Sequence, residues 1–180
     1  MDLKKIFRSF RKEIDDLDDD FSMEETLRKI LPMLKSEEEI IAVLKKSNYD
    51  HKLCCDSIPF LKINGKNTNE VMELIEATEY NNSALWAFFR FLKVEEKTEE
   101  QRYELIVRSR FNIEFCRWML PFLSSSEKIM YVLNICKYDI HLCILAIKLL
   151  PRERKDDALK ILENTAYHQS VCLAVLENFK

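Results

Sequence analysis

Glycine is nearly absent from this chain of 180 residues, which has 1 glycine and 4 prolines. Average usage would give roughly 20 of the two together. β-Hairpin turns, phosphate-binding loops and nucleophile elbows need glycine at positions where the backbone angle φ is positive. The scarcity of glycine therefore predicts an all-α protein. Because the sequence also has no glycine-rich phosphate loop, HExxH or GxSxG motif, we expect no enzymatic activity and no cofactor.

Long apolar runs and an excess of one charge are missing as well. The longest apolar stretch, residues 142–150, is interrupted by Lys148 and is far shorter than the ~20 residues that cross a bilayer. Residues 1–13 lack the apolar region of a secretory signal. The 28 Lys and Arg against 31 Asp and Glu give a net charge of −3, which disfavours a dedicated nucleic-acid-binding protein. We therefore expect a cytoplasmic or nuclear protein with reduced cysteines and no membrane contact.

The sequence contains an internal repeat, seen in five windows with one layout. The windows cover 40–61, 71–92, 102–123, 129–150 and 158–179. Both halves of each window carry apolar residues at helical spacing, and an aromatic residue lies between the halves. The aromatic residues are spaced by 31, 31, 27 and 29 positions and are Tyr49, Tyr80, Phe111, Tyr138 and Tyr167. Each window is therefore predicted to form two amphipathic helices.

The residue after each aromatic residue marks the start of the second helix. This position is held by Asp50, Asn81, Asn112, Asp139 and His168. Asp and Asn side chains accept hydrogen bonds from the free amides of a first helical turn, so we predict a helix N-cap here. The aromatic residue then precedes the cap, where it can pack back on the new helix. Capping-box sequences at 22–25, 36–39 and 98–101 predict further helix starts, and Gly65 predicts a helix end.

Residues 1–35 have the features of a degenerate unit. Residues 27–34 match the end of the windows around Pro32, and residues 3–17 provide a helical partner that ends in the acidic run 15–20. We interpret that run as a solvated helix end, because its spacing offers no ligand geometry for a cation.

Two-helix units that cannot bury their apolar faces alone stack in series as an α-solenoid. We therefore predict a single domain over residues 1–180, a right-handed α-solenoid of about five to six two-helix repeats of ~27–31 residues. After the unit at 1–35, the repeats are expected at 36–67, 68–97, 98–125, 126–154 and 155–180. The layout resembles HEAT-like and TPR-like αα-repeats in its length and its two amphipathic helices. The TPR signature residues and the Thr-Pro-Leu-His of ankyrin repeats are missing, so the resemblance implies an architecture and no site residues.

Cysteine and histidine are the residues that could bind a metal here. One repeat position, which Leu85 holds in the second window, is held in the others by Cys54, Cys116, Cys143 and Cys172. A position shared with leucine indicates packing in the core. Cys55 directly follows Cys54, and Cys136 stands alone, so no zinc-binding spacing is present. The histidines, His51, His141 and His168, lie at second-helix starts in different windows, so neither a metal site nor a catalytic triad is expected.

Large residues at repeat positions that vary between windows are candidates for binding. Trp86 holds a position occupied elsewhere by Cys55, Arg117, Ile144 and Leu173, and Trp118 holds one occupied by Asp56, Ala87, Leu145 and Ala174. Each position accepts a charged residue in another window, so we expect both tryptophans to be at least partly exposed. Tryptophan is strongly enriched among binding anchors. The alternative is that each tryptophan fills a gap between helices.

Cations surround the two tryptophans in the sequence. They are Arg90, Arg108, Arg110 and Arg117, with Lys93 and Arg102 nearby. Arginine beside tryptophan could bind an acidic protein segment or stack on nucleic-acid bases. The alternative is a solvated ridge, because glutamates are interleaved with these arginines.

These features favour a non-enzymatic adaptor or scaffold that mediates protein–protein interaction within a larger assembly. An acidic segment of the partner would bind a concave face of the second helices through the two tryptophans and the four arginines. The alternative is an RNA- or ribonucleoprotein-associated factor, for example a ribosome-associated one, that uses the arginine surface on phosphates; the negative net charge ranks it second. The last helix is apolar around much of its circumference, so we expect Val171, Leu173 and Val175 to contact a partner or a second copy.

Overall fold

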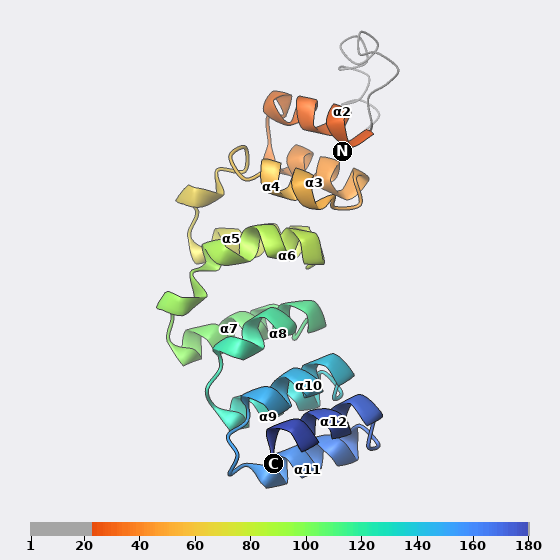
Figure 1. The fold of residues 1–180 in the computed structure, drawn as a ribbon. Coiled ribbons are helices and arrows are strands. Elements are labelled where there is room, and N and C mark those ends of the chain that lie inside the picture. The colour runs from red at the N-terminus through yellow and green to blue at the C-terminus, as the bar shows by residue number, and fades with distance from the viewer. Residues whose placement is uncertain (1–22, 180) are drawn as a thin grey trace. The chain divides into compact units, whose positions relative to one another are not determined.

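The structure, a computed structural model, describes residues 23–179. These residues form eleven α-helices and five short 3-10 helices, with no β-strand among them (Figure 1). The all-α prediction is therefore confirmed. The predicted helix at 3–17, the acidic run at 15–20 and the cap at Ser22 lie outside the described residues. The chain divides into two compact units, Met1–Leu92 and Lys93–Lys180.

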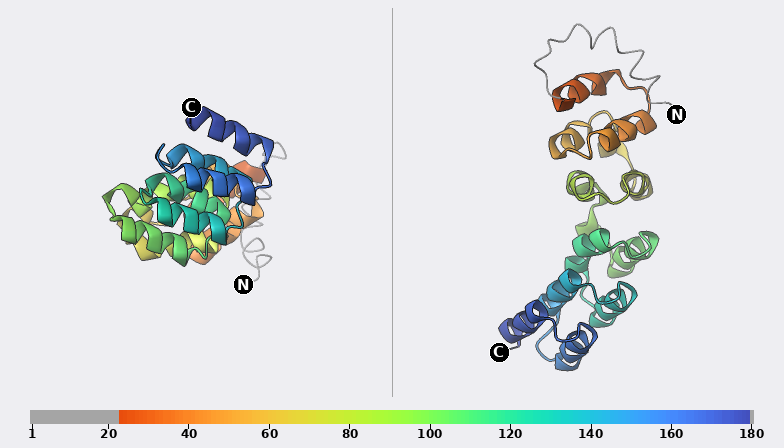
Figure 2. Two further views of the ribbon diagram at one scale, coloured as in Figure 1. Left: turned by 90° about the horizontal axis from the view of Figure 1, so that it is seen from below. Right: turned by 90° about the vertical axis from the view of Figure 1, so that its right-hand side faces the viewer.

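The first unit contains five α-helices. They are α2 (Met23–Ile30), α3 (Glu37–Lys46), α4 (His51–Asp56), α5 (Thr68–Ala77) and α6 (Asn82–Phe88). Three 3-10 helices accompany them: η1 (Leu31–Met33), η2 (Ile63–Gly65) and η3 (Phe89–Leu92). Helix α4 packs against both α2 and α6, and α5 packs against α6 and η3. Figure 2 (right) shows α5 and α6 end-on, side by side.

The second unit contains six α-helices. They are α7 (Glu99–Arg108), α8 (Ile113–Met119), α9 (Ser126–Ile135), α10 (Ile140–Leu149), α11 (Lys155–Asn164) and α12 (Gln169–Asn178). Two 3-10 helices, η4 (Val94–Glu96) and η5 (Leu120–Phe122), complete it. Helix α10 lies at the centre, where it packs against α8, α9 and α12 (Figure 1). Each predicted window thus holds one helix pair: α3–α4, α5–α6, α7–α8, α9–α10 or α11–α12.

The predicted N-caps of the second helices are confirmed in four of the five pairs. The side chains that accept a hydrogen bond from a first-turn amide are Asp50, Asn81, Asn112 and Asp139. His168 holds the fifth position without a side-chain hydrogen bond. Among the first helices, Thr98 and Gln101 form the complete capping box predicted there. Ser36 caps α3, but Glu39 accepts from the amide of Lys35 instead of closing a box on Ser36.

In all five pairs, the first helix ends in the same turn, in which two consecutive residues have a positive φ. These residues are Asn48–Tyr49, Glu79–Tyr80, Arg110–Phe111, Lys137–Tyr138 and Ala166–Tyr167. In each turn, the amide of the aromatic residue donates to the carbonyl five residues earlier, as Tyr138 does to Leu133 at 2.8 Å. The preceding amide donates to the carbonyl three residues earlier, as Lys137 does to Asn134 at 3.1 Å. This pair of bonds is the Schellman motif, which satisfies the last carbonyls of a helix.

Glycine takes no part in these turns. Gly65 is the last residue of η2, so a short 3-10 helix does end there, but its φ is not positive. Lys62, just before η2, holds the left-handed position in its place, with φ 51°. The all-α prediction is correct, but a low glycine content does not exclude a positive φ. Twelve non-glycine residues among those described have a positive φ. The backbone hydrogen bonds of the Schellman turn offset the steric cost of the side chains.

Candidate functional site

Trp86 is exposed and is held in place by an aromatic neighbour. Its side chain, on α6, is 55% exposed. The indole ring lies 4.3 Å from the imidazole of His51, centroid to centroid, with the planes tilted by 58°. His51 is the first residue of α4, so the contact joins the second helices of two neighbouring pairs. The expected exposure of Trp86 is confirmed.

Arg90 follows on the same unit, in η3. Its side chain is exposed, and the guanidinium carbon lies 4.8 Å from the ring centroid of Phe91, within cation–π range. The charge of Arg90 also acts on Cys55 of α4. Burial raises the pKa of the Cys55 thiol, and the positive charge of Arg90 lowers it in part. An exposed tryptophan on α6 and an exposed cation in η3, which directly follows α6, thus lie in the first unit.

The repeat position of Trp86 faces solvent in every window. Trp86 and Leu173 are exposed at this position, and Cys55, Arg117 and Ile144 are half-buried. The position of Trp118 is more enclosed, because Ala87 and Ala174 are buried there while Asp56, Trp118 and Leu145 are half-buried. The position of Trp86 is therefore at least partly exposed in every window and that of Trp118 only in some, and Trp86 is the more exposed of the two tryptophans.

The other four predicted site residues lie in the second unit. Arg117 donates to the carboxylate of Glu114 one turn earlier, at 3.0 Å, and its Nε atom is buried without a hydrogen-bond partner among the described residues. Trp118 is the next residue of α8, and Arg108 is the half-buried last residue of α7. Arg110 is exposed in the turn before α8. The six residues therefore fall into two groups, Trp86 with Arg90 in the first unit and these four in the second.

Arg102, which the sequence grouped with the surface cations, has a structural role. Its guanidinium donates to the backbone carbonyls of Val94 at 2.9 Å, Phe122 at 2.9 Å and Glu95 at 3.1 Å. These bonds tie α7 to η4 and η5. A guanidinium used in this way is not available to a partner. No side-chain pattern could have indicated this role, because all three acceptors are backbone atoms.

The cysteines are mainly packing residues, as predicted, with two differences. Cys54, Cys116 and Cys143 are fully buried, and burial raises the pKa of the Cys54 and Cys143 thiols to about 12. Cys172 is only half-buried, because no helix follows α12 within the described residues to cover it. Cys136 does not stand alone: its sulfur lies 4.0 Å from that of Cys116, since the end of α9 packs near α8.

Neither a metal site nor a membrane helix is found in the part of the chain that the structure describes. No group of three or more His, Cys, Asp or Glu side chains converges among residues 23–179. The three histidines start or precede different helices, and His141 and His168 are exposed. Within the same residues, no helix has the length and apolar character needed to cross a bilayer.

The apolar face of the last helix is smaller than the sequence predicted. Val171 is fully buried, so the expectation that it contacts a partner is wrong: its side chain already packs inside the second unit. Leu173 is 53% exposed and Val175 is half-buried, so both stay available. Leu176 of α12 and Leu159 of α11 are exposed as well.

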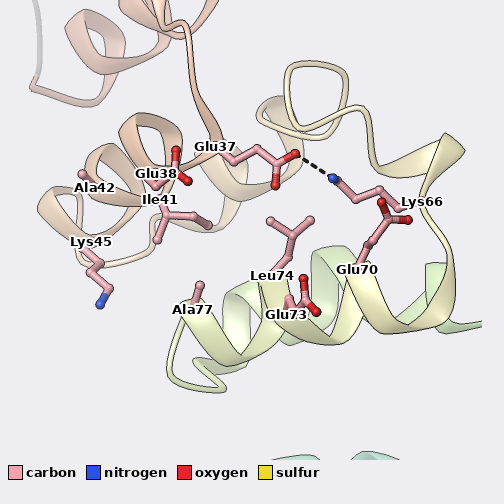
Figure 3. Close-up of a pocket in the computed structure, with 10 residues that line it drawn as sticks. All are labelled: Glu37, Glu38, Ile41, Ala42, Lys45, Lys66, Glu70, Glu73, Leu74 and Ala77. Carbon is pink, nitrogen blue, oxygen red and sulfur yellow. Dashed lines mark hydrogen bonds and ion pairs between the residues drawn. The ribbon is translucent and has the colours of Figure 1, made fainter.

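A groove that the sequence analysis missed lies between α3 and α5, the first helices of two neighbouring pairs (Figure 3). Its volume is about 810 Å³. The lining residues are Glu37, Glu38, Ile41, Ala42, Lys45, Lys66, Glu70, Glu73, Leu74 and Ala77. Four glutamates thus surround a small apolar floor. The sequence feature that could have indicated this groove is Ala42 and Ala77, which hold repeat positions occupied by larger residues in the second unit.

Comparison with known proteins assigns no family to this chain. No protein-family model, no curated protein and no solved structure matches it. Its class therefore follows from its own geometry, which is that of an all-α protein with an exposed tryptophan on its second helices.

Proposed function

We propose that this protein is a non-enzymatic helical-repeat adaptor that binds a protein partner through the second helices of its pairs. The observation that carries the proposal is Trp86, which is 55% exposed and held against His51. An exposed indole with a fixed neighbour loses little side-chain entropy on binding, and covering it removes a large apolar area from water. Both properties are those of a binding anchor.

The repeated local structure supports the α-solenoid part of the proposal. The five helix pairs share one Schellman turn, and second helices pack on second helices in each unit: α4 on α2 and α6, and α10 on α8 and α12. Units that contact their sequence neighbours are the basis of solenoid folds. We propose that the pairs form one right-handed array and a single domain.

The charges beside the anchor suggest the chemistry of the partner. Arg90 is exposed four residues after Trp86 and in the same unit, and Arg110 is exposed in the second unit with no ion pair to a described residue. Arginine binds carboxylates through two parallel hydrogen bonds. The partner is therefore a protein segment with Asp or Glu beside an apolar side chain, in the cytoplasm or the nucleus.

The proposal is tested by affinity purification of the tagged protein from cells that express it, followed by mass spectrometry. Three forms are compared: the wild type, Trp86→Ala with Arg90→Ala, and the control Tyr167→Ala. Tyr167 is also an exposed aromatic residue, at 61%, but lies outside the proposed surface. We expect stoichiometric protein partners that are lost in the double variant and kept in the control.

Nuclease treatment of half of each sample tests the alternative, an RNA-associated role. Partners that disappear with nuclease would contradict the adaptor and favour an RNA-associated role. Salt gives a second criterion, because binding to phosphates weakens steeply and log-linearly with ionic strength, whereas an anchor-dominated protein interface loses much less. Circular dichroism of the double variant must match the wild type, so that loss of partners reports the surface.

A further inference from the structure

The groove between α3 and α5 is open because its walls are small. Ala42 and Ala77 face it from the two helices, and Ile41 and Leu74 form a floor that is less than a tenth exposed (Figure 3). The groove lies on the first helices, so it belongs to a different set of elements from the one that carries Trp86.

The corresponding place in the second unit is filled. The repeat spacing aligns Ile41 with Tyr103 of α7, and Glu73 with Tyr131 of α9. The rings of Tyr103 and Tyr131 lie 6.3 Å apart at 67°, and the ammonium of Lys128 lies 5.6 Å from the Tyr103 ring. The open groove is therefore a property of the first unit and not of the repeat in general.

The groove is negative at neutral pH. Its two cations are already neutralised, Lys66 by Glu37 and Lys45 by Glu79, each at 2.6 Å. Among residues 23–179, the donors to Glu38 and Glu70 are neutral. The Ser36 hydroxyl lowers the pKa of Glu38, and the backbone amide of Asn67 donates to Glu70 at 2.7 Å. Both carboxylates are therefore available to a cation.

We infer that this groove is a docking surface for a basic amphipathic segment of a protein partner. Lys or Arg side chains of the segment pair with Glu38 and Glu70, and small apolar side chains cover the floor formed by Ile41 and Leu74. Charge complementarity selects the sign of the partner, and the apolar floor selects an amphipathic segment over a simple polycation. This inference does not depend on the Trp86 surface, which fits the opposite charge.

The test titrates the isotope-labelled full chain with a short synthetic peptide of Lys, Leu and Ala in helical amphipathic order. A peptide with Glu in place of every Lys is the control ligand. We expect amide shifts on α3 and α5 with the lysine peptide only. In Glu38→Gln with Glu70→Gln, the affinity should fall about tenfold. Glutamine at position 70 still accepts from the Asn67 amide, so the cap of α5 is kept.

Two further variants test whether the peptide binds specifically in the groove. Glu96→Gln with Glu153→Gln removes the same charge from exposed residues of the second unit and should leave the affinity unchanged. Ala77→Tyr, at an exposed position, should block the groove without loss of helicity. The inference is overturned if the lysine peptide shifts residues outside α3 and α5, if the control variant weakens binding equally, or if Ala77→Tyr binds like the wild type.

Discussion

The Trp86 indole packs against the His51 imidazole with ring centroids 4.3 Å apart, and this contact joins α6 to α4. Aromatic pairs of this kind contribute about 0.5–1.5 kcal/mol beyond their buried area. We therefore predict a coupling energy in that range in a double-mutant cycle of Trp86→Ala and His51→Ala, measured by urea unfolding.

The single variant Trp86→Ala of this cycle tests whether Trp86 is an exposed residue or part of the core. Because Trp86 is 55% exposed, Trp86→Ala alone should lower the free energy of unfolding by about 1–2 kcal/mol, less than the 3–5 kcal/mol typical of a buried tryptophan. The comparison is Trp118→Ala, whose side chain is half-buried and which should cost more. A larger loss for Trp86 than for Trp118 would place Trp86 in the core.

The Schellman turns predict that glycine stabilises this protein. Lys137 is exposed with φ 52°. The left-handed conformation costs a non-glycine residue about 1–2 kcal/mol, and glycine gives back part of the gain by its greater freedom in the unfolded chain. Lys137→Gly should therefore raise the free energy of unfolding by about 0.5–1 kcal/mol. The control Lys160→Gly, inside α11, should lower it by about 1 kcal/mol. Equal effects of the two changes would contradict the turn geometry.

Glu99 links α7 to the loop before α9 in a pH-dependent way. Its carboxylate accepts from the Ser124 hydroxyl at 2.7 Å and from the amides of Ser124 at 3.0 Å and Ser125 at 2.6 Å. The Ser124 hydroxyl and these amides lower the pKa of Glu99. A carboxyl whose pKa is lower in the folded state stabilises the fold above its ordinary pKa, and this stabilisation is lost as the pH falls through the lowered value.

Substitution of Glu99 tests this link. Glu99→Gln should lower the free energy of unfolding by about 1 kcal/mol at neutral pH, because solvent screens part of these charge-assisted bonds. It should also flatten the decline of stability with acid. Glu100→Gln is the control: its exposed pair with Lys128 should matter little. Parallel pH profiles of the wild type and Glu99→Gln would refute the assignment.

The six thiols should divide into two classes by reactivity. Cys55 and Cys172 are half-buried, and the other four cysteines are buried. Because the thiolate is the reactive form, burial that raises the pKa of Cys54 and Cys143 to about 12 protects them. We predict two fast thiols in the native protein with a chromogenic disulfide reagent, and six in denaturant. Cys55→Ser with Cys172→Ser should remove the fast phase; persistence of that phase would show that the buried thiols open readily.

The local structure of this protein was predictable from its amino-acid pattern. Helix pairs, the caps at Asp50, Asn81, Asn112 and Asp139, and the aromatic residue before each cap were all predictable. Each depends on hydrogen bonds or packing between residues at most about five positions apart, so the pattern of side chains is enough. The exposure of Trp86 was expected because its repeat position holds a charged residue, Arg117, in another window. This signal is not sufficient by itself, because the position of Trp118 holds Asp56 in one window and the buried Ala87 and Ala174 in others.

Contacts between residues far apart in the chain were not predictable and are seen only in the folded protein. His51 contacts Trp86 across 35 positions, Cys116 meets Cys136, and Arg102 binds backbone carbonyls instead of facing solvent. Packing between helices also buried Val171 and left the groove beside Ala77 open. These outcomes depend on the rotation and distance between neighbouring helices. Because all the side chains at an interface together determine that geometry, the residue at a single repeat position does not predict it.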